Sequence, residues 1–132
     1  MIKVTVESLF QELKEPLNLE FLVDCPPETS AIQAGDVHRP AMALMGFAEN
    51  FQAHRIQVFG ESENAFLMTL SEDDQCTAVG RVLDLNPPVL FVARGHHLSG
   101  SVHALMVSRA VPVLQSSLTA VELIAGLTHF LE

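Results

Sequence analysis

Histidines and arginines in two short segments are the side chains best suited to chemistry in this sequence. His96 and His97 follow Gly95, and His103 lies close behind them. Neutral imidazole is a good metal ligand, but a metal site needs three or four converging ligands, and residues 93–110 contain no Cys, Asp or Glu. We therefore interpret these histidines as exposed loop and helix residues. We expect neither a metal site nor a catalytic residue in this chain.

The arginines give a more specific indication of a binding site, because of their positions relative to the apolar runs. Val89–Ala93 is a continuous apolar run of strand length, and Arg94 and Gly95 follow it directly. Gly60 ends a second run, and Arg39 precedes a segment with a helical pattern. Ligands of open parallel sheets bind outside the carboxyl ends of the strands, and arginine holds carboxylates and phosphates bidentately. Arg94, Gly95, Arg39 and Gly60 are therefore our candidates for binding a small anion.

The alternative reading of these arginines is structural. Arg94 can pair with one of the 16 acidic residues, within the chain or across a subunit contact. Arg39 and Arg55 stand at the two ends of one helix–strand segment, and we interpret them as fixing those ends by pairing with acidic side chains.

Motifs for nucleotide chemistry are missing from the sequence. It contains no G-x-x-x-x-G-K-[ST] loop, no G-x-G-x-x-G after a strand and no G-x-S-x-G nucleophile elbow. Neither Lys3 nor Lys14 follows a glycine. We expect no cofactor in this chain.

Composition and net charge limit the classes of molecule that this chain is expected to bind. Hydrophobic residues make up 48% and charged residues 17%, as in a globular domain, and 16 acidic against 7 basic residues give a net charge of −9. This charge repels phosphate backbones and anionic lipid, so we expect neither nucleic acid nor membrane as a partner.

We find no leader or membrane-spanning pattern and expect a cytoplasmic protein. Cys25 and Cys76 are isolated, which favours buried reduced thiols.

Helix start and stop signals, together with the periodicity of apolar residues, predict the helices and strands. Capping residues mark the start of three expected helices: Thr5 before 6–14, Ser71 with Asp74 for 71–83, and the Thr119-x-x-Glu122 capping box for the last helix. Further helices are expected from Pro40, with Leu44, Phe47 and Phe51 on one face, and over 61–70 and 101–110. Strands are expected over 17–23, 31–37, 56–59, 89–93 and 112–114.

The order of these elements predicts the architecture. From residue 55 onward strands alternate with helices, which indicates a mostly parallel sheet with helices on both faces. The first third is less regular and is expected to add an antiparallel edge strand. We predict one α/β domain over residues 1–132, a three-layer α/β/α arrangement with a mostly parallel (mixed) sheet.

Several blocks, in this order, resemble the N-terminal domain of bacterial HPr kinase/phosphorylase. The blocks are Asp36-Val37-His38-Arg39-Pro40, Leu44-Met45-Gly46-Phe47, Arg55-Ile56-Gln57-Val58-Phe59-Gly60, Glu63 with Phe66-Leu67, PPVLFVARGHHL and the final AVPVLQSSLTAVELIAGLTHFLE. Departures from the family pattern are His38 for asparagine, Ala41 for glycine, Phe66 for tyrosine and Ala93 for threonine.

The resemblance implies a fold similar to the N-terminal domains of Mur ligases. It also implies a parent enzyme of the sugar phosphotransferase system that phosphorylates a serine of HPr with ATP or pyrophosphate and Mg²⁺, reverses this by phosphorolysis and assembles as a hexamer. The family places that chemistry in a second, P-loop domain, whose motifs are not among these 132 residues.

Three functional hypotheses follow. The first is a non-catalytic assembly or regulatory domain that associates with itself and, by resemblance, with the kinase domain and HPr. The second is a stand-alone module that binds a small anion or nucleotide and has no kinase activity. The third is a divergent enzyme that uses the histidines.

Overall fold

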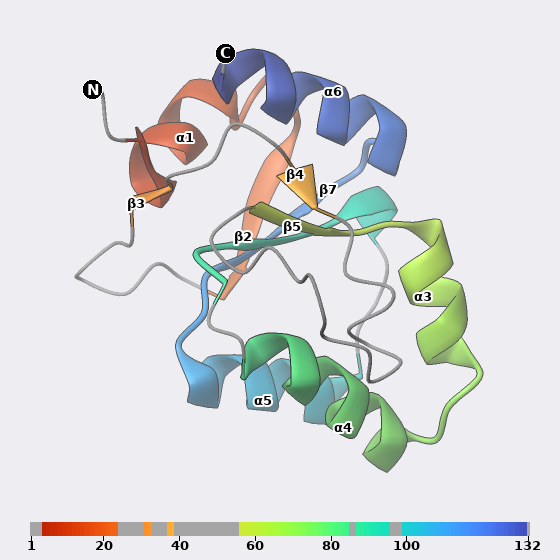
Figure 1. The fold of residues 1–132 in the computed structure, drawn as a ribbon. Helices are drawn as coiled ribbons and strands as arrows, with labels where there is room; N and C mark the ends of the chain where they lie inside the picture. Colours follow the sequence, from red (N-terminus) through yellow and green to blue (C-terminus); the bar gives the residue numbers. More distant parts are fainter. Residues whose placement is uncertain are drawn as a thin grey trace.

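The computed structural model describes residues 4–23, 31–32, 37–38, 56–84, 87–95 and 99–131 (Figure 1). The strands are β1 (Val4–Thr5), β2 (Leu19–Val23), β3 (Ala31–Ile32), β4 (Val37–His38), β5 (Ile56–Phe59), β6 (Leu90–Val92) and β7 (Val113–Ser116). The helices are α1 (Val6–Leu13), α3 (Glu61–Met68), α4 (Glu72–Leu83), the short 3₁₀ turn η1 (Ala93–Gly95), α5 (Gly100–Arg109) and α6 (Ala120–Leu131).

Hydroxyl side chains begin four of these helices. In each case a Ser or Thr oxygen accepts a hydrogen bond from the backbone N–H three residues on, which satisfies one of the free donors at a helix start. The pairs are Thr5 with Ser8 at 3.1 Å, Ser71 with Asp74 at 3.2 Å, Ser99 with Val102 at 3.2 Å and Thr119 with Glu122 at 3.2 Å. The capping signals read from the sequence at residues 5, 71 and 119 are therefore confirmed.

The main sheet has five strands in the order β2-β7-β6-β5-β4. Strands β4 to β7 pair in parallel, and β2 runs antiparallel to β7 with Leu19 opposite Ser116. The predicted mixed sheet with an antiparallel edge strand from the first third is thus confirmed. A separate two-stranded ladder joins β1 to β3.

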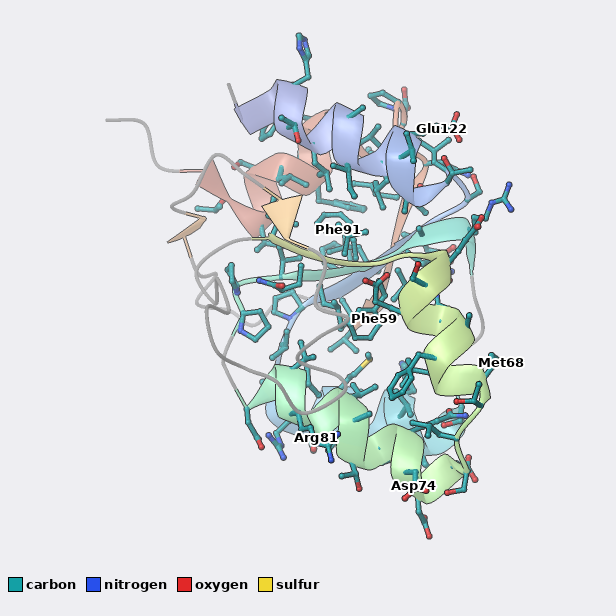
Figure 2. All side chains as sticks on the ribbon, turned by 45° about the vertical axis from the view of Figure 1, so that its right-hand side comes forward. Phe59, Met68, Asp74, Arg81, Phe91 and Glu122 are labelled. Atoms are coloured by element: carbon teal, nitrogen blue, oxygen red, sulfur yellow. The ribbon has the colours of Figure 1, made fainter. Side chains whose placement is uncertain are left out.

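Successive side chains of the inner strands lie on opposite faces of the sheet and pack into two different cores. Ile56, Val58, Phe91 and Leu114 pack with α1 and α6 on one face. Phe59, Leu90, Val92 and Val113 pack with α3, α4 and α5 on the other face. Figure 1 shows α1 and α6 above the sheet and α4 and α5 below it, and Figure 2 shows Phe91 and Phe59 on opposite sides of the sheet. This gives the three-layer α/β/α fold.

Some boundaries differ from the sequence prediction. The single strand expected over 31–37 is two separate strands, β3 and β4, which pair with different partners. A register shift between Phe21 and Val23 interrupts β2. The helix expected from Pro40 lies outside the described residues, as do Arg39, Arg55 and Cys25. Within the described ranges, no helix has the length and apolar character needed to cross a bilayer.

Helix α6 approaches the segment before β2 closely at Gly126. A Cβ added there would lie 2.5 Å from Leu17 Cδ2 and 3.2 Å from Leu17 Cδ1. Leu17 is itself buried in the core beneath α1 and α6. A side chain at residue 126 would therefore have to push the end of the buried Leu17 side chain aside.

Replacing Gly126 by Ala is expected to destabilise the fold. Overpacking against Leu17 costs about 1–3 kcal/mol, which outweighs the gain of up to about 1 kcal/mol in helix propensity. Chemical denaturation would measure the free energy of unfolding. In a Leu17→Ala background the added methyl has room, so the same substitution should become neutral or stabilising. A similar loss in both backgrounds would contradict the packing explanation.

Candidate functional site

The carboxyl ends of β5, β6 and β7 lie together at one edge of the sheet. Parallel pairing sets Phe59 of β5 opposite Val92 of β6. The chain continues there through Gly60, the Ala93–Gly95 turn and residues 117–119, which we call the carboxyl edge. The structure therefore brings three of the predicted candidates to one edge, namely Gly60, Arg94 and Gly95.

Arg94 holds an uncommon backbone conformation in the turn after β6. Its φ of 60° and ψ of 20° lie in the left-handed region, which only a few per cent of non-glycine residues adopt. The Arg94 N–H donates to the Leu118 carbonyl at 2.8 Å, which joins the turn after β6 to the segment that opens α6. The strained residue is thus held by a contact between two parallel strand ends.

The guanidinium of Arg94 pairs with a carboxylate of α3, and its charge also acts on a carboxylate of α6. Arg94 Nη1 lies 3.0 Å from Glu61 Oε1 at the start of α3, and the side chains are 52% and 63% exposed, so solvent screens the pair. The pKa of Glu122 at the start of α6 is lowered, mainly by the hydrogen bond from the Thr119 N–H, then by the Thr119 hydroxyl and by the charge of Arg94.

The backbone of Gly60 forms hydrogen bonds with two residues of the first turn of α3. Its N–H donates to Glu63 Oε1 at 2.8 Å, and Glu63 is only 1% exposed. The Gly60 carbonyl accepts from the Asn64 N–H at 3.0 Å. The carboxylate of Glu63, in the first turn of α3, therefore caps the start of its own helix.

Three acidic side chains thus engage the groups at the carboxyl edge that a bound anion would use. Glu61 faces the Arg94 guanidinium, and Glu63 accepts from the Gly60 N–H. Glu122 Oε1 accepts from the Thr119 N–H at 3.1 Å and from its hydroxyl at 3.0 Å. These carboxylates repel an incoming anion and satisfy the donors at two helix starts.

Sequence reasoning found the arginine at this edge but missed its partners. The capping box at Thr119 was predicted, yet nothing local in the sequence places it beside Arg94. Glu61 and Glu63 follow Gly60 directly, and their position after a strand-ending glycine was the available signal. Arg39 lies outside the described residues, and the anion site as a whole stays a prediction.

The histidines do not converge in the described structure. His96 and His97 lie outside the described residues, whereas His103 is exposed on α5, as expected. Its Nε2–H donates to the Leu22 carbonyl of the edge strand β2 at 2.9 Å. Among the described residues, no group of three or more His, Cys, Asp or Glu is arranged to hold a metal ion.

A groove of about 390 Å³ lies between α4 and α5. Its walls are Cys76, Thr77, Gly80, Arg81, Asp84, Leu105 and Arg109. Cys76 is a free, half-buried thiol rather than a fully buried one, and its pKa is raised by burial and by the charges of Glu72 and Asp73. Arg109 and Asp84, two of the residues that line the groove, form an ion pair. The raised pKa leaves Cys76 a weak nucleophile.

Replacing Glu122 by Gln should lower stability at neutral pH by removing the charged acceptor of the Thr119 bonds. Because the pKa of Glu122 is depressed from its ordinary value of 4.5, its contribution is present above that value and is lost as pH falls through the folded-state pKa. The difference in melting temperature between wild type and variant should therefore shrink in acid. Glu12→Gln, on the exposed side of α1, controls for loss of one charge. A pH-independent difference would contradict the assignment.

Comparison with known proteins identifies the family. The family described as "HPr Serine kinase N terminus" matches residues 4–131. The HPr kinase/phosphorylase of Shouchella clausii is 30% identical over 132 residues, which are 100% of this chain and 41% of the relative. That of Chloroherpeton thalassium is 28% identical over 98% of this chain and 38% of the relative. The chain therefore spans about two fifths of the length of these relatives.

A solved structure shares the fold. The CBS and DRTGG domains of the regulatory region of Clostridium perfringens pyrophosphatase, complexed with the activator diadenosine tetraphosphate, align with a TM-score of 0.59 and 15% identity over 89% of this chain and 44% of that one. At this identity the likeness concerns architecture alone. From the match over residues 4–131, the chain belongs to the HPr serine kinase N-terminus family.

Proposed function

We propose that this chain is a non-catalytic assembly and regulatory domain that acts within an HPr serine kinase/phosphorylase. The family match covers residues 4–131, and this region makes up about two fifths of the curated relatives. In this proposal the kinase domain and HPr are the partners of the assembled protein, and ATP with Mg²⁺ serves the parent enzyme. The domain itself contributes self-association.

The observation that carries the proposal is the engagement of the carboxyl edge by acidic side chains. A phosphate-binding loop presents backbone N–H groups and a cation to its ligand. Here the Gly60 N–H and the Arg94 guanidinium meet Glu63 and Glu61 instead, in a chain with a net charge of −9. The edge is therefore better suited to holding helices in place than to gripping a triphosphate.

The purified chain is expected to transfer no phosphate to HPr. The assay supplies HPr, ATP and Mg²⁺ and follows labelled phosphate on HPr, with the full-length Shouchella clausii relative as positive control. The matching phosphorolysis assay starts from serine-phosphorylated HPr with inorganic phosphate. Transfer by the chain above the blank that disappears in the Arg94→Met variant would overturn the proposal.

A second candidate is a regulatory module that binds a small anion or nucleotide at Arg94. The left-handed backbone of this residue favours it, because strain of this kind gathers at functional sites. The regulatory region of the structurally similar pyrophosphatase was solved with diadenosine tetraphosphate. In this reading Gly60 and Gly95 give the ligand access to the backbone, and Arg39 adds a second cation.

Thermal denaturation with ligand separates the two candidates. Under the first proposal, ATP, diadenosine tetraphosphate and inorganic phosphate leave the melting temperature unchanged. A ligand at 100 times its dissociation constant would add about 2.7 kcal/mol, which is easily measured. A shift that is lost in Arg94→Met and kept in Arg81→Met, a control on α4, would favour the second candidate.

A further inference from the structure

The groove between α4 and α5 lies away from the candidate site at the carboxyl edge. Figure 1 shows these two helices side by side below the sheet. Arg109 in the last turn of α5 pairs with Asp84 at the end of α4, so the two helices run in the same direction. Their ends lead along the chain to the starts of β6 and β7, whereas Arg94 follows the end of β6. The groove and the carboxyl edge are therefore separate places in the fold.

Charged and apolar side chains line different parts of this groove. The part nearest the ends of the two helices is lined by Arg81, Asp84 and Arg109, and we call it the arginine end. Its two guanidiniums and one carboxylate leave one net positive charge, in a chain whose net charge is −9. Toward the helix starts, the lining includes the half-buried Leu105 and Cys76. The volume of about 390 Å³ falls in the range of small-molecule sites, roughly 300–1,000 Å³.

Gly80, a buried residue of the groove lining, is a glycine that packing does not require. Among the described residues, a Cβ added there would meet Leu105 Cδ2 at 3.8 Å, which is an ordinary van der Waals contact. At Gly126, by contrast, the added Cβ would lie 2.5 Å from Leu17 Cδ2. Glycine is, after proline, the least favourable residue in a helix interior. Helix α4 is therefore less stable than it could be at a residue where the missing side chain deepens the groove.

We propose that this groove binds a small organic carboxylate with an apolar chain. The carboxylate lies at the arginine end, between the guanidiniums of Arg81 and Arg109. The apolar chain lies over Gly80 and along Leu105, and it points toward Cys76. This ligand site is apart from the carboxyl edge, and it does not depend on the place of the domain within a kinase/phosphorylase.

The arginine end has donors for one carboxylate. A guanidinium carries five N–H donors, and Arg109 uses Nη1 for Asp84. The two side chains are 38% and 62% exposed, so solvent screens the pair and a ligand can reach it. The planar fork of arginine binds a carboxylate through two parallel N–H···O bonds. A phosphate monoester carries about −1.5 to −2 charges at pH 7, which exceeds the net positive charge here, so a carboxylate is the better match.

The helix ends by themselves account for the arginines but not for the groove. Arg81 and Arg109 lie in the last turns of α4 and α5, where positive charge complements the helix dipole. That arrangement needs neither a glycine in the helix interior nor an open volume beside it. Gly80 and the groove are explained by a molecule that lies against α4.

Amide NMR of the isotope-labelled chain tests the site and its charge preference. Hexanoate is expected to move the amide signals of Thr77, Gly80 and Leu105 saturably, with a dissociation constant in the millimolar range of a small ligand in an exposed groove. Hexylammonium has the same chain and the opposite charge, and should bind about tenfold more weakly or less. Equal effects of the two probes, or no movement of these signals with hexanoate in excess, would overturn the proposal.

Substitutions separate the role of the arginine end from that of Gly80. Arg81→Met and Arg109→Met should each weaken hexanoate binding about tenfold, whereas the matched control Arg94→Met should leave it unchanged. Gly80→Ala should raise the melting temperature through its helix propensity and still weaken hexanoate binding, because the added methyl group occupies the groove. Wild-type affinity in Arg109→Met or in Gly80→Ala would contradict the proposed pose.

Protection of the Cys76 thiol tests how far the apolar chain reaches. In a Cys25→Ser background, iodoacetamide alkylates Cys76 at mildly alkaline pH, which the raised pKa of this thiol requires, and mass spectrometry follows the rate. Hexanoate should slow the alkylation in proportion to the fraction bound, whereas acetate, which has no apolar chain, should not. Absence of protection, or protection that persists in Arg109→Met, would place the chain elsewhere and overturn the proposal.

Discussion

Burial of the inner strands on both faces is the constraint on which the rest of this structure depends. In β5, β6 and β7 the side chains alternate between the core under α1 and α6 and the core under α3, α4 and α5. A strand covered on both sides has room for polar groups chiefly at its ends. The carboxyl edge, with Arg94, Gly60 and three glutamates, is where such groups gather. The candidate site is thus a consequence of how the sheet is covered.

The same constraint explains which parts of the fold were predictable. The apolar run Val89–Ala93 and the hydroxyl caps at Thr5, Ser71 and Thr119 are local signals, and each gave the right element. The strand expected over 31–37 was misread because two-residue strands leave no periodicity to detect. They are defined only by partners elsewhere in the chain.

The candidate site was predictable only in part, for a similar reason. Arg94 could be found because it follows an evident strand, but its ion pair with Glu61 depends on the order of strands in the sheet. The burial of Gln57, Glu63 and Asn64 also escaped sequence reasoning, since polar residues are expected on the surface. The Nδ2 of Asn64 meets no hydrogen-bond acceptor in the described part of the chain.

The pairing of β2 with β7 has a consequence for how the chain reaches its fold. Contacts between these regions join residues 95 to 99 positions apart, as in Gln115 with Glu20, Ser116 with Leu17 and Asn18 with Ser117. Among the described strands β7 is the one that pairs with β2, so β2 stays without this partner until residues 113–116 have emerged from the ribosome. Folding that depends on such distant closure is slow, and a nascent chain would keep Phe21 and Leu22 open to chaperones until β7 arrives.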